Sequence, residues 1–404
     1  MRAPMRLFRP LSFAVLGVGM AGGAIGALYV GVLRWMTSLL GPDGRGDLAV
    51  VAVLVATGLA IALLVHLLGD TGDVELLVDN VHIGAAADRR ALRSLIPVSL
   101  LGIAAGGALG PEAPLVQTAG TVGTEAGSRM GADRATVRIL AITGMASAFA
   151  VLFGAPLGSA LFALEILHRR GLEYYEALLP ALCGALTGFA VNLFLEGSSF
   201  GPVFELAPAE VGRVTDLGWA AIAALAGVGI AVAFTWSVRA ARTAAAYVPA
   251  WIRPALGGLV VGLLSLWSFG ALTFGEHQIA DLASPDVGVR FLAAALASKL
   301  IASAVCAATG WRGGFIIPLF FAGAACGLLL HEALPSVDAT MLMAAAMVAA
   351  CTGVTKTPLG STLVVTEMAG LHLLPTTTLA AVIAVVLTSE VHLIHSQRAR
   401  TTTP

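Results

Sequence analysis

The chain has 404 residues, of which 58% are hydrophobic and only 12% are charged. A soluble domain carries about 25% charged residues, so a chain this apolar lacks the polar surface to cover itself in water. The formal net charge of -1 gives no reason to expect a nucleic acid or another polyanion as partner. Composition therefore predicts an integral membrane protein and excludes a soluble globular domain.

Several apolar runs approach the roughly 20 residues that a helix needs to cross about 30 Å of hydrocarbon. In chain order they are Leu11–Leu33, Leu48–Leu68, Leu92–Leu109, Trp219–Trp236 and Leu373–Leu387. The strict alternation of apolar and polar residues that marks a membrane β-barrel strand is absent from the sequence. Because only helices and closed barrels satisfy their backbone groups in lipid, the sequence predicts an all-α integral membrane protein.

The ends of the chain suggest how it is oriented. The run Leu11–Leu33 follows three arginines within residues 2–9 and is too long for a typical signal-peptide core. Cationic flanks favour the cytoplasmic side, so we expect a first spanning helix with a cytoplasmic N-terminus. The C-terminus, with Arg398 and Arg400, is expected on the same side. The predicted location is the cell membrane (inner or plasma membrane), crossed many times.

Glycine and proline cut the apolar segments at residues 110–114, 154–156, 310–318 and 357–358. Unpaired backbone at membrane depth is tolerated only where it lies inside protein or lines a cavity. These interruptions therefore predict many tilted, broken or re-entrant helices rather than simple spanning rods.

Two of the interrupted segments match each other. Residues 155–165 (APLGSALFALE) and 357–367 (TPLGSTLVVTE) are identical at six of eleven positions, 202 residues apart. Pro114-Leu115 and Pro318-Leu319 keep a similar spacing. Chance similarity among Ala-, Leu- and Gly-rich helices is the alternative to a duplicated unit. Inverted repeats place ion sites near the bilayer midplane, where half-helix ends meet. The predicted units are residues 1–210 and residues 211–404, the second with a short C-terminal tail.

Glu112 is the acid that the sequence singles out. It lies between two apolar segments in Gly110-Pro-Glu-Ala-Pro114, where the two prolines predict a break and a new helix beginning near Pro114. An acid in hydrocarbon is costly unless it faces a polar pathway. A helix N-terminus attracts anions, so the carboxylate can occupy an anion site and leave it when protonated or displaced. An acid in an interfacial loop is the alternative.

The second half supplies a partner turn, Gly310-Trp-Arg-Gly-Gly-Phe-Ile-Ile-Pro318. Its backbone N–H groups at Phe315 and Ile316 are expected to form a second anion-binding nest. A third candidate is the polar turn Gly69-Asp-Thr-Gly72, where Thr71 offers a hydroxyl. Read alone, that turn is an ordinary loop. The cysteines and histidines show no ligand spacing, so we expect no metal site.

These motifs resemble those of the CLC family of chloride channels and anion/proton antiporters. The stretch 110–114, followed by Val116-Gln117, is similar to the family's gating motif, and Gly314–Pro318 is similar to its Gly-x-Phe-x-Pro motif. The segments that begin at Phe153 and Thr357 resemble the family's two Pro-Leu helices. The resemblance covers roughly residues 10–400 and suggests a divergent bacterial-type member without cytoplasmic regulatory domains.

The resemblance implies a CLC-like inverted-repeat fold, a homodimer with one pore in each subunit, and anions held by backbone amides and a few hydroxyls. By this resemblance Glu112 is the gating, proton-linked glutamate. The remaining anion-binding positions that it implies are Gly110, Ala113, Gly314, Phe315, Ile316, Thr71 and Gly72. No cofactor is expected apart from bound chloride or a similar anion.

Three departures from the family pattern bear on mechanism. The matching place of the inner-gate tyrosine is Ile394, and the place of the acid that relays protons is Ile166. The central-site serine motif is not intact, and Thr71 is its nearest substitute. Glu165 and Glu367 occupy equivalent places in the two repeats, which favours a structural pairing or helix-end role over a proton path.

The predicted function is transmembrane transport of small inorganic anions, with chloride as the expected substrate, through a pore gated by Glu112. Conduction and exchange both remain open. The alternative is a proton-coupled antiporter for fluoride or another anion, because family members lacking the usual serine and inner glutamate still export anions against protons. An intramembrane enzyme is not expected, since no His-Glu-x-x-His motif occurs in the sequence.

Overall fold

The computed structural model of the protein describes residues 10–71, 89–167, 172–197, 206–209, 211–284 and 287–393. Within these ranges, seven helices are long and apolar enough to cross a membrane. The same ranges contain no β-strand, only one isolated bridge between two residues. The chain is therefore an all-α integral membrane protein, as its composition predicts.

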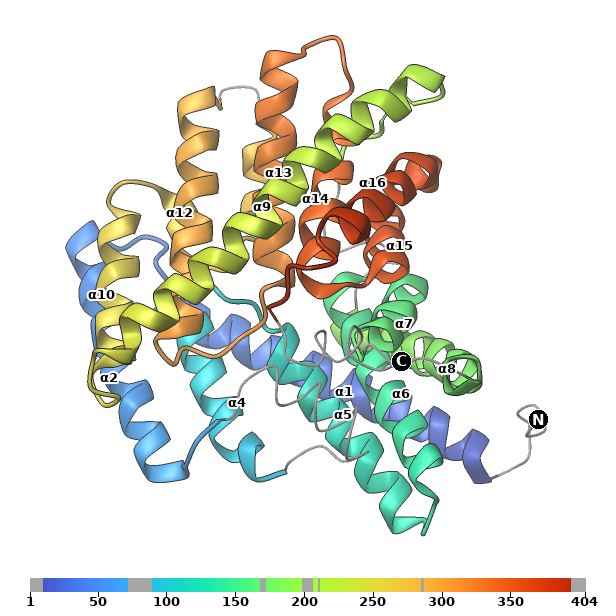
Figure 1. The fold of residues 1–404 in the computed structure, drawn as a ribbon. Coiled ribbons are helices and arrows are strands. Elements are labelled where there is room, and N and C mark those ends of the chain that lie inside the picture. Colours follow the sequence, from blue (N-terminus) through green and yellow to red (C-terminus); the bar gives the residue numbers. More distant parts are fainter. Residues whose placement is uncertain are drawn as a thin grey trace.

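The helices fall into two groups in chain order. The first group is α1 (Pro10–Leu40), α2 (Asp47–Leu68), α4 (Arg89–Ala104), α5 (Glu112–Arg129), α6 (Arg134–Phe153), α7 (Pro156–Glu165) and α8 (Leu172–Glu196). The second group is α9 (Val214–Ala246), α10 (Arg253–Ser265), η2 (Phe269–Ala271), α11 (Gln278–Leu282), α12 (Val289–Ala308), α13 (Ile316–Ala333), α14 (Ala339–Thr355), α15 (Pro358–Ala369), η3 (Leu371–Leu373) and α16 (Leu374–Leu387). In Figure 1 most of the first group lies below the second, with α2 beside α10, and the helices of both groups run at many different tilts.

Most of the predicted spans are helical, but one ends early. The run Leu92–Leu109 was expected to be a single span, whereas α4 ends at Ala104. There the chain turns at Gly106, whose φ of 104° is accessible to glycine at little cost. The N–H of Gly107 then donates to Gly102 O at 2.9 Å. This break leaves the chain non-helical just before Glu112.

The two halves use matching devices to begin and end equivalent helices. Asp133 caps the start of α6 by accepting from the N–H of Thr136, and Asp338 caps α14 by accepting from Met341 N. Both helices end at a left-handed residue, Gly154 after α6 and Lys356 after α14. Side-chain caps satisfy N–H groups that a helix start leaves without partners.

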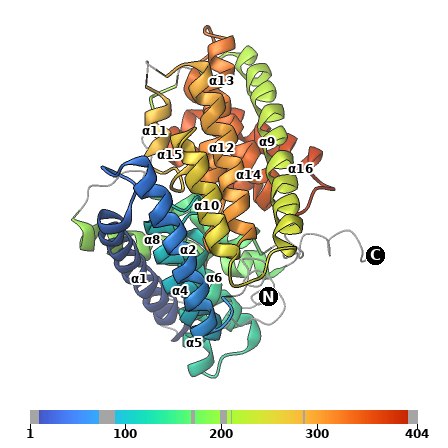
Figure 2. The same ribbon diagram turned by 90° about the vertical axis from the view of Figure 1, so that its left-hand side faces the viewer.

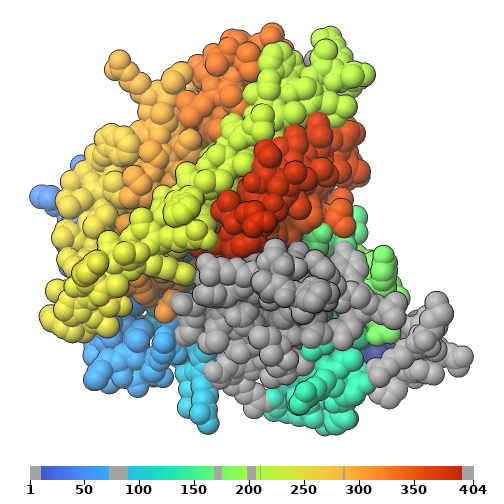
Figure 3. Space-filling model, viewed as in Figure 1, coloured from blue at the N-terminus to red at the C-terminus, as the bar shows by residue number. Residues whose placement is uncertain are grey.

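Helices from the two halves also pack directly on each other. Figure 2 shows α2 beside α10, and a side chain on Gly58 or Gly258 would collide with the backbone of the opposing helix. The short helices α7 and α15 contact each other closely at Gly158 and Gly360. Figure 3 shows α16 lying along α9 on one outer face. Small residues at such crossings allow the close helix approach that membrane packing favours.

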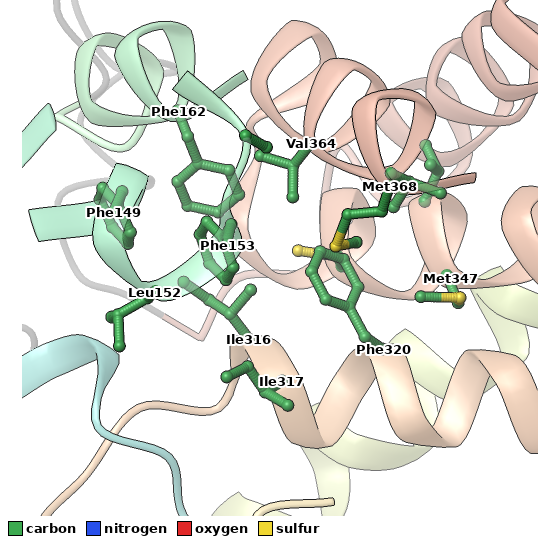
Figure 4. Close-up of a cluster of buried hydrophobic side chains, with 14 of the residues drawn as sticks. Phe149, Leu152, Phe153, Phe162, Ile316, Ile317, Phe320, Met347, Val364 and Met368 are labelled. Atoms are coloured by element: carbon green, nitrogen blue, oxygen red, sulfur yellow. The ribbon is translucent and has the colours of Figure 1, made fainter. Parts of the chain in front are cut away.

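The largest buried cluster lies where α6, α7, α13, α14 and α15 meet. Figure 4 shows three phenylalanines of the first half, Phe149, Phe153 and Phe162, facing Phe320 of α13. The ring of Phe153 lies 6.1 Å from that of Phe320, edge to face. This core fixes the start of α13 against the first half and so positions the site described below.

Candidate anion site

The two halves meet at a pair of glycines. Gly110 N donates to Gly314 O at 2.8 Å, and Gly314 N donates to Gly110 O at 2.6 Å. These reciprocal bonds form the single isolated bridge of the described structure. They bring the breaks at 110–114 and 310–318 side by side and place the starts of α5 and α13 next to each other.

Glu112 is the first residue of α5, two residues before the predicted helix start. Pro114 is accommodated because the first helical turn leaves its N–H groups unbonded in any case. The Glu112 side chain is 1% exposed. Its Oε1 accepts from the N–H of Ile317, in the first turn of α13, at 2.6 Å, and the amide of Ile316 adds a further interaction. The carboxylate thus occupies the positive end of a helix from the other half.

The glycine bridge also shapes the room for this carboxylate. A Cβ atom on Gly110 or on Gly314 would collide with Glu112 Oε2. That oxygen is buried and has no hydrogen-bond partner among the described residues. The pair therefore forms a cradle that fits one small anionic group, in which the second oxygen is held by shape and by the helix end rather than by a donor.

Thr71 lies beside the same turn of the second half. Its buried hydroxyl accepts a hydrogen bond from Arg312 Nε, and Arg312 Nη2 lies 3.7 Å from Asp70 Oδ1. Because the guanidinium supplies the donor, the hydrogen of the Thr71 hydroxyl is free to point elsewhere. The structure thus brings a hydroxyl and a permanent positive charge next to the Gly313-Gly314 turn.

The other predicted positions are distributed as follows. Phe315 is the N-cap of α13 and Ile316 its first residue, so the amide that binds the carboxylate most closely is one residue beyond the predicted pair. Ala113 is the second residue of α5. Ile166 is buried at the end of α7, where its N–H donates to Phe162 O. Gly72 and Ile394 lie outside the described residues.

Three charged residues near the site were not predicted, namely Arg312, Lys299 and Glu276. Arg312 sits inside the glycine-rich turn, and an arginine within a predicted membrane break is a signal that the sequence contained. Lys299 is fully buried on α12, and its Nζ donates to Leu272 O at 2.8 Å, Thr273 O at 2.6 Å and Gln278 Oε1 at 3.3 Å. Its bonds hold the segment before α11 in place. The sequence contains no pattern that predicts these hydrogen-bond acceptors of Lys299.

Glu276 belongs to that segment and lies near enough for its charge to act on Glu112. Burial raises the pKa of the Glu276 carboxyl, while the nearby charges of His277 and Arg34 lower it. Thr273, three residues earlier, donates its N–H to Gly106 O at 2.8 Å. The segment that Lys299 holds therefore places a second acid close to the Glu112 cradle.

Comparison with known proteins identifies the family of the chain. Residues 80–389 match the family model described as voltage gated chloride channel. The chain is 28% identical over 407 residues to the ion-transport protein YfeO of Escherichia coli O1:K1, covering 93% of this chain and 91% of that protein. It is 27% identical over 369 residues to a chloride/fluoride channel protein of Pseudomonas syringae pv. tomato, covering 86% and 78%.

Solved structures share the fold. A slow cyanobacterial Cl⁻/H⁺ antiporter superposes with a TM-score of 0.82 at 18% identity, covering 98% of both chains. A CLC-type fluoride/proton antiporter superposes with a TM-score of 0.81 at 21% identity, covering 96% of this chain and 97% of that one. Because the family model matches most of the sequence, the chain belongs to the voltage-gated chloride channel (CLC) family.

Proposed function

We propose that the protein transports small inorganic anions, chloride first among them, along a pathway in which the Glu112 carboxylate is the gate. One observation carries this proposal: Glu112 Oε1 accepts the Ile317 N–H at 2.6 Å inside a cradle formed by Gly110 and Gly314. A halide has the same charge as the carboxylate and accepts the same N–H donors. The side chain and a transported anion therefore compete for one site.

Family membership supports anion transport as the general activity. The arrangement also suggests how the gate opens. None of the ion pairs that the described residues form includes Glu112, and its carboxylate is buried. A buried charge without a counter-charge is costly, so protonation of the carboxylate, or displacement by an incoming anion, frees the cradle.

A second candidate, proton-coupled exchange of fluoride or chloride, is favoured by the same enclosed acid. A proton that reaches Glu112 and leaves with each cycle couples the two fluxes. Two of the structural neighbours are antiporters of this kind, one for chloride and one for fluoride. The absence of an acid at Ile166 removes the family's usual inner relay but leaves Glu112 in place.

Reconstitution in liposomes tests both readings. Anion efflux through the wild-type protein should exceed the leak of protein-free vesicles, first in chloride and then in fluoride. With opposed anion and pH gradients, an exchanger has a reversal potential that shifts with both gradients. A reversal potential that follows the anion gradient alone would refute the exchange reading and keep the conducting one. No efflux of either anion would refute the function itself.

We further propose that the protein acts as a homodimer with both termini on the cytoplasmic side, as the family resemblance implies. Exposed leucines on α7 and α15, Leu157 at 43% and Leu359 at 50%, offer apolar surface to a second copy or to lipid. Chemical cross-linking in native membranes distinguishes the dimer, and protease access to tagged termini in inverted vesicles distinguishes the orientation.

A further inference from the structure

Four buried side chains of the second half form a connected polar row, here called the hydroxyl seam: Cys351, Thr355, Thr357 and Ser361. All four are 0% exposed. Thr355 Oγ1 lies 2.6 Å from Thr357 Oγ1, and Thr357 Oγ1 lies 3.0 Å from Ser361 Oγ. Cys351 Sγ lies 3.4 Å from Ser361 Oγ and 3.7 Å from Thr355 Oγ1. Each group can both accept and donate a hydrogen bond.

The first half has no such row. Its helix α6 ends at Phe153 before left-handed Gly154, as α14 ends at Thr355 before left-handed Lys356. With the halves aligned at these ends, the seam positions correspond to Phe149, Phe153, Ala155 and Ser159. Phe149 and Phe153 stack there with ring centroids 5.6 Å apart, as Figure 4 shows. The second half therefore replaces a dry aromatic stack by polar groups, at a burial cost that packing alone does not explain.

Comparison of equivalent helices in the two halves indicates which helix the Thr355 end of the seam faces. Phe153 packs on Phe320, which lies one turn beyond Ile316, the first residue of α13. Glu112 is the first residue of α5, the equivalent helix. By the same relation we expect Thr355, which corresponds to Phe153, to face the first turn of α5. Consistent with this, Cys351 of α14 and Leu115 and Val116 of α5 belong to the same buried cluster.

The other end of the seam lies at the start of α15. Thr357 is the N-cap of this helix, and the helix's first amides, Leu359 N and Gly360 N, donate to the half-buried carboxylate of Glu165. Lys356 sits between two seam residues in sequence, but its ammonium donates to Gly353 O and Thr388 O, away from the seam. One end of the seam thus lies at the helix start that a partly exposed acid caps, and the equivalence of the halves directs its other end toward the gate. No cation lies along the seam among the described residues.

From this arrangement we infer that the hydroxyl seam is the route by which protons reach and leave Glu112. It would replace the proton-relay acid whose position Ile166 occupies. The inference rests on the proposed proton-coupled exchange. In one transfer, the seam accepts a proton at its Thr357–Ser361 end and releases another from its Cys351–Thr355 end to the Glu112 carboxylate. Each hydroxyl exchanges one O–H bond for another, so the seam itself is unchanged. The neutral acid then yields its cradle to an anion.

The test uses purified protein in liposomes, with anion efflux and proton uptake recorded together by two electrodes. Thr355→Val removes the seam's central hydroxyl with almost no change in volume, and Ser361→Ala interrupts its other end. Thr355→Ser keeps a hydroxyl and serves as the rescue. The matched control is Thr366→Val on α15, a buried threonine whose hydroxyl bonds only to carbonyls of its own helix, Thr362 O and Leu363 O.

The expected result is that Thr355→Val and Ser361→Ala lower proton uptake by about tenfold or more while anion efflux persists. The proton-to-anion ratio should stay at the wild-type value in Thr355→Ser and Thr366→Val. Persisting anion efflux shows that each variant is folded. If the proton-to-anion ratio of both Thr355→Val and Ser361→Ala equals that of the wild type, the seam is not the proton route. The proposed proton-coupled exchange is not contradicted by that result. Anion efflux without proton movement in the wild type overturns the exchange, and the seam with it.

Discussion

Glu165 and Glu367 each bind the start of the helix that carries the other. Glu165 accepts from Leu359 N at 3.2 Å and Gly360 N at 2.7 Å, and Glu367 accepts from Leu157 N at 3.2 Å and Gly158 N at 2.7 Å. The two pairs of distances are equal. A carboxylate at a helix start satisfies N–H groups and complements the helix dipole. These crossed caps join the two halves where α7 and α15 meet.

Removing one crossed cap should destabilise the protein without changing its transport chemistry. Glu367→Ala leaves the amides of Leu157 and Gly158 without their charged acceptor, which costs about 1–3 kcal/mol. Unfolding in denaturing detergent measures the change in the free energy of unfolding. Glu332→Ala, at an exposed glutamate near the end of α13, is the control and should be neutral. Unchanged stability in Glu367→Ala would show that the caps are incidental.

The glycine cradle predicts gating variants. In Gly314→Ala the new methyl group would collide with Glu112 Oε2, so the carboxylate is expected to leave the closed position. Because the same methyl group fills the cradle in which a transported anion binds, anion efflux at neutral pH should fall several-fold. Gly229→Ala on α9, where nothing lies within 4 Å of the added carbon, should behave as the wild type. Efflux in Gly314→Ala equal to the wild-type rate would mean that the cradle is not part of the anion pathway.

Lys299 is expected to be needed for stability near the site. Lys299→Met removes the donor to two carbonyls and to Gln278, and leaving buried acceptors without partners costs about 1–3 kcal/mol each. The detergent-solubilised variant should therefore unfold at a clearly lower temperature than the wild type. Arg290→Met, an exposed cation at the start of the same helix, provides the comparison. Equal melting temperatures for both variants would contradict this role.

Arg312 is expected to strengthen anion binding next to Thr71. Arg312→Gln removes a positive charge and the donor to the Thr71 hydroxyl, and a loss of about 1.4 kcal/mol corresponds to tenfold weaker binding. Calorimetric titration with chloride or fluoride measures the dissociation constant. The control is Arg253→Gln, whose half-buried guanidinium bonds to Val248 O at the start of α10. An unchanged dissociation constant in Arg312→Gln would exclude this residue from the anion pathway.

Features that depend on local pattern could be predicted from the sequence. Apolar runs predict the membrane helices, and the Gly-Pro breaks predict where the chain stops being helical, so Glu112 emerges at a helix start. The equal places of Glu165 and Glu367 in the two matched segments indicate a paired helix-end role, and their crossed bonds confirm it. Each of these signals is a local pattern, or a match between two local patterns, that can be read without knowing which segments touch in the fold.

Features that depend on contacts between the halves could not be predicted. Arg312 and Thr71 are 241 residues apart in sequence, and only the meeting of the halves makes them neighbours. The same holds for the Ile317 amide, which binds Glu112 because the first turn of α13, beginning at Ile316, meets the start of α5. The end of α4 at Ala104 was missed because a run of Ile, Ala and Leu reads as continuous helix, whereas Gly106 and Gly107 allow the chain to turn.

The most direct test of the account is the pH dependence of anion efflux in wild type and Glu112→Gln. Glutamine keeps the size of the side chain but has no charge, so it resembles the protonated gate at every pH. Wild-type efflux is predicted to increase as the pH falls, while the variant is predicted to be fast and nearly independent of pH. Efflux from Glu112→Gln that still increases with acidity as in the wild type would contradict the assignment of Glu112 as the gate.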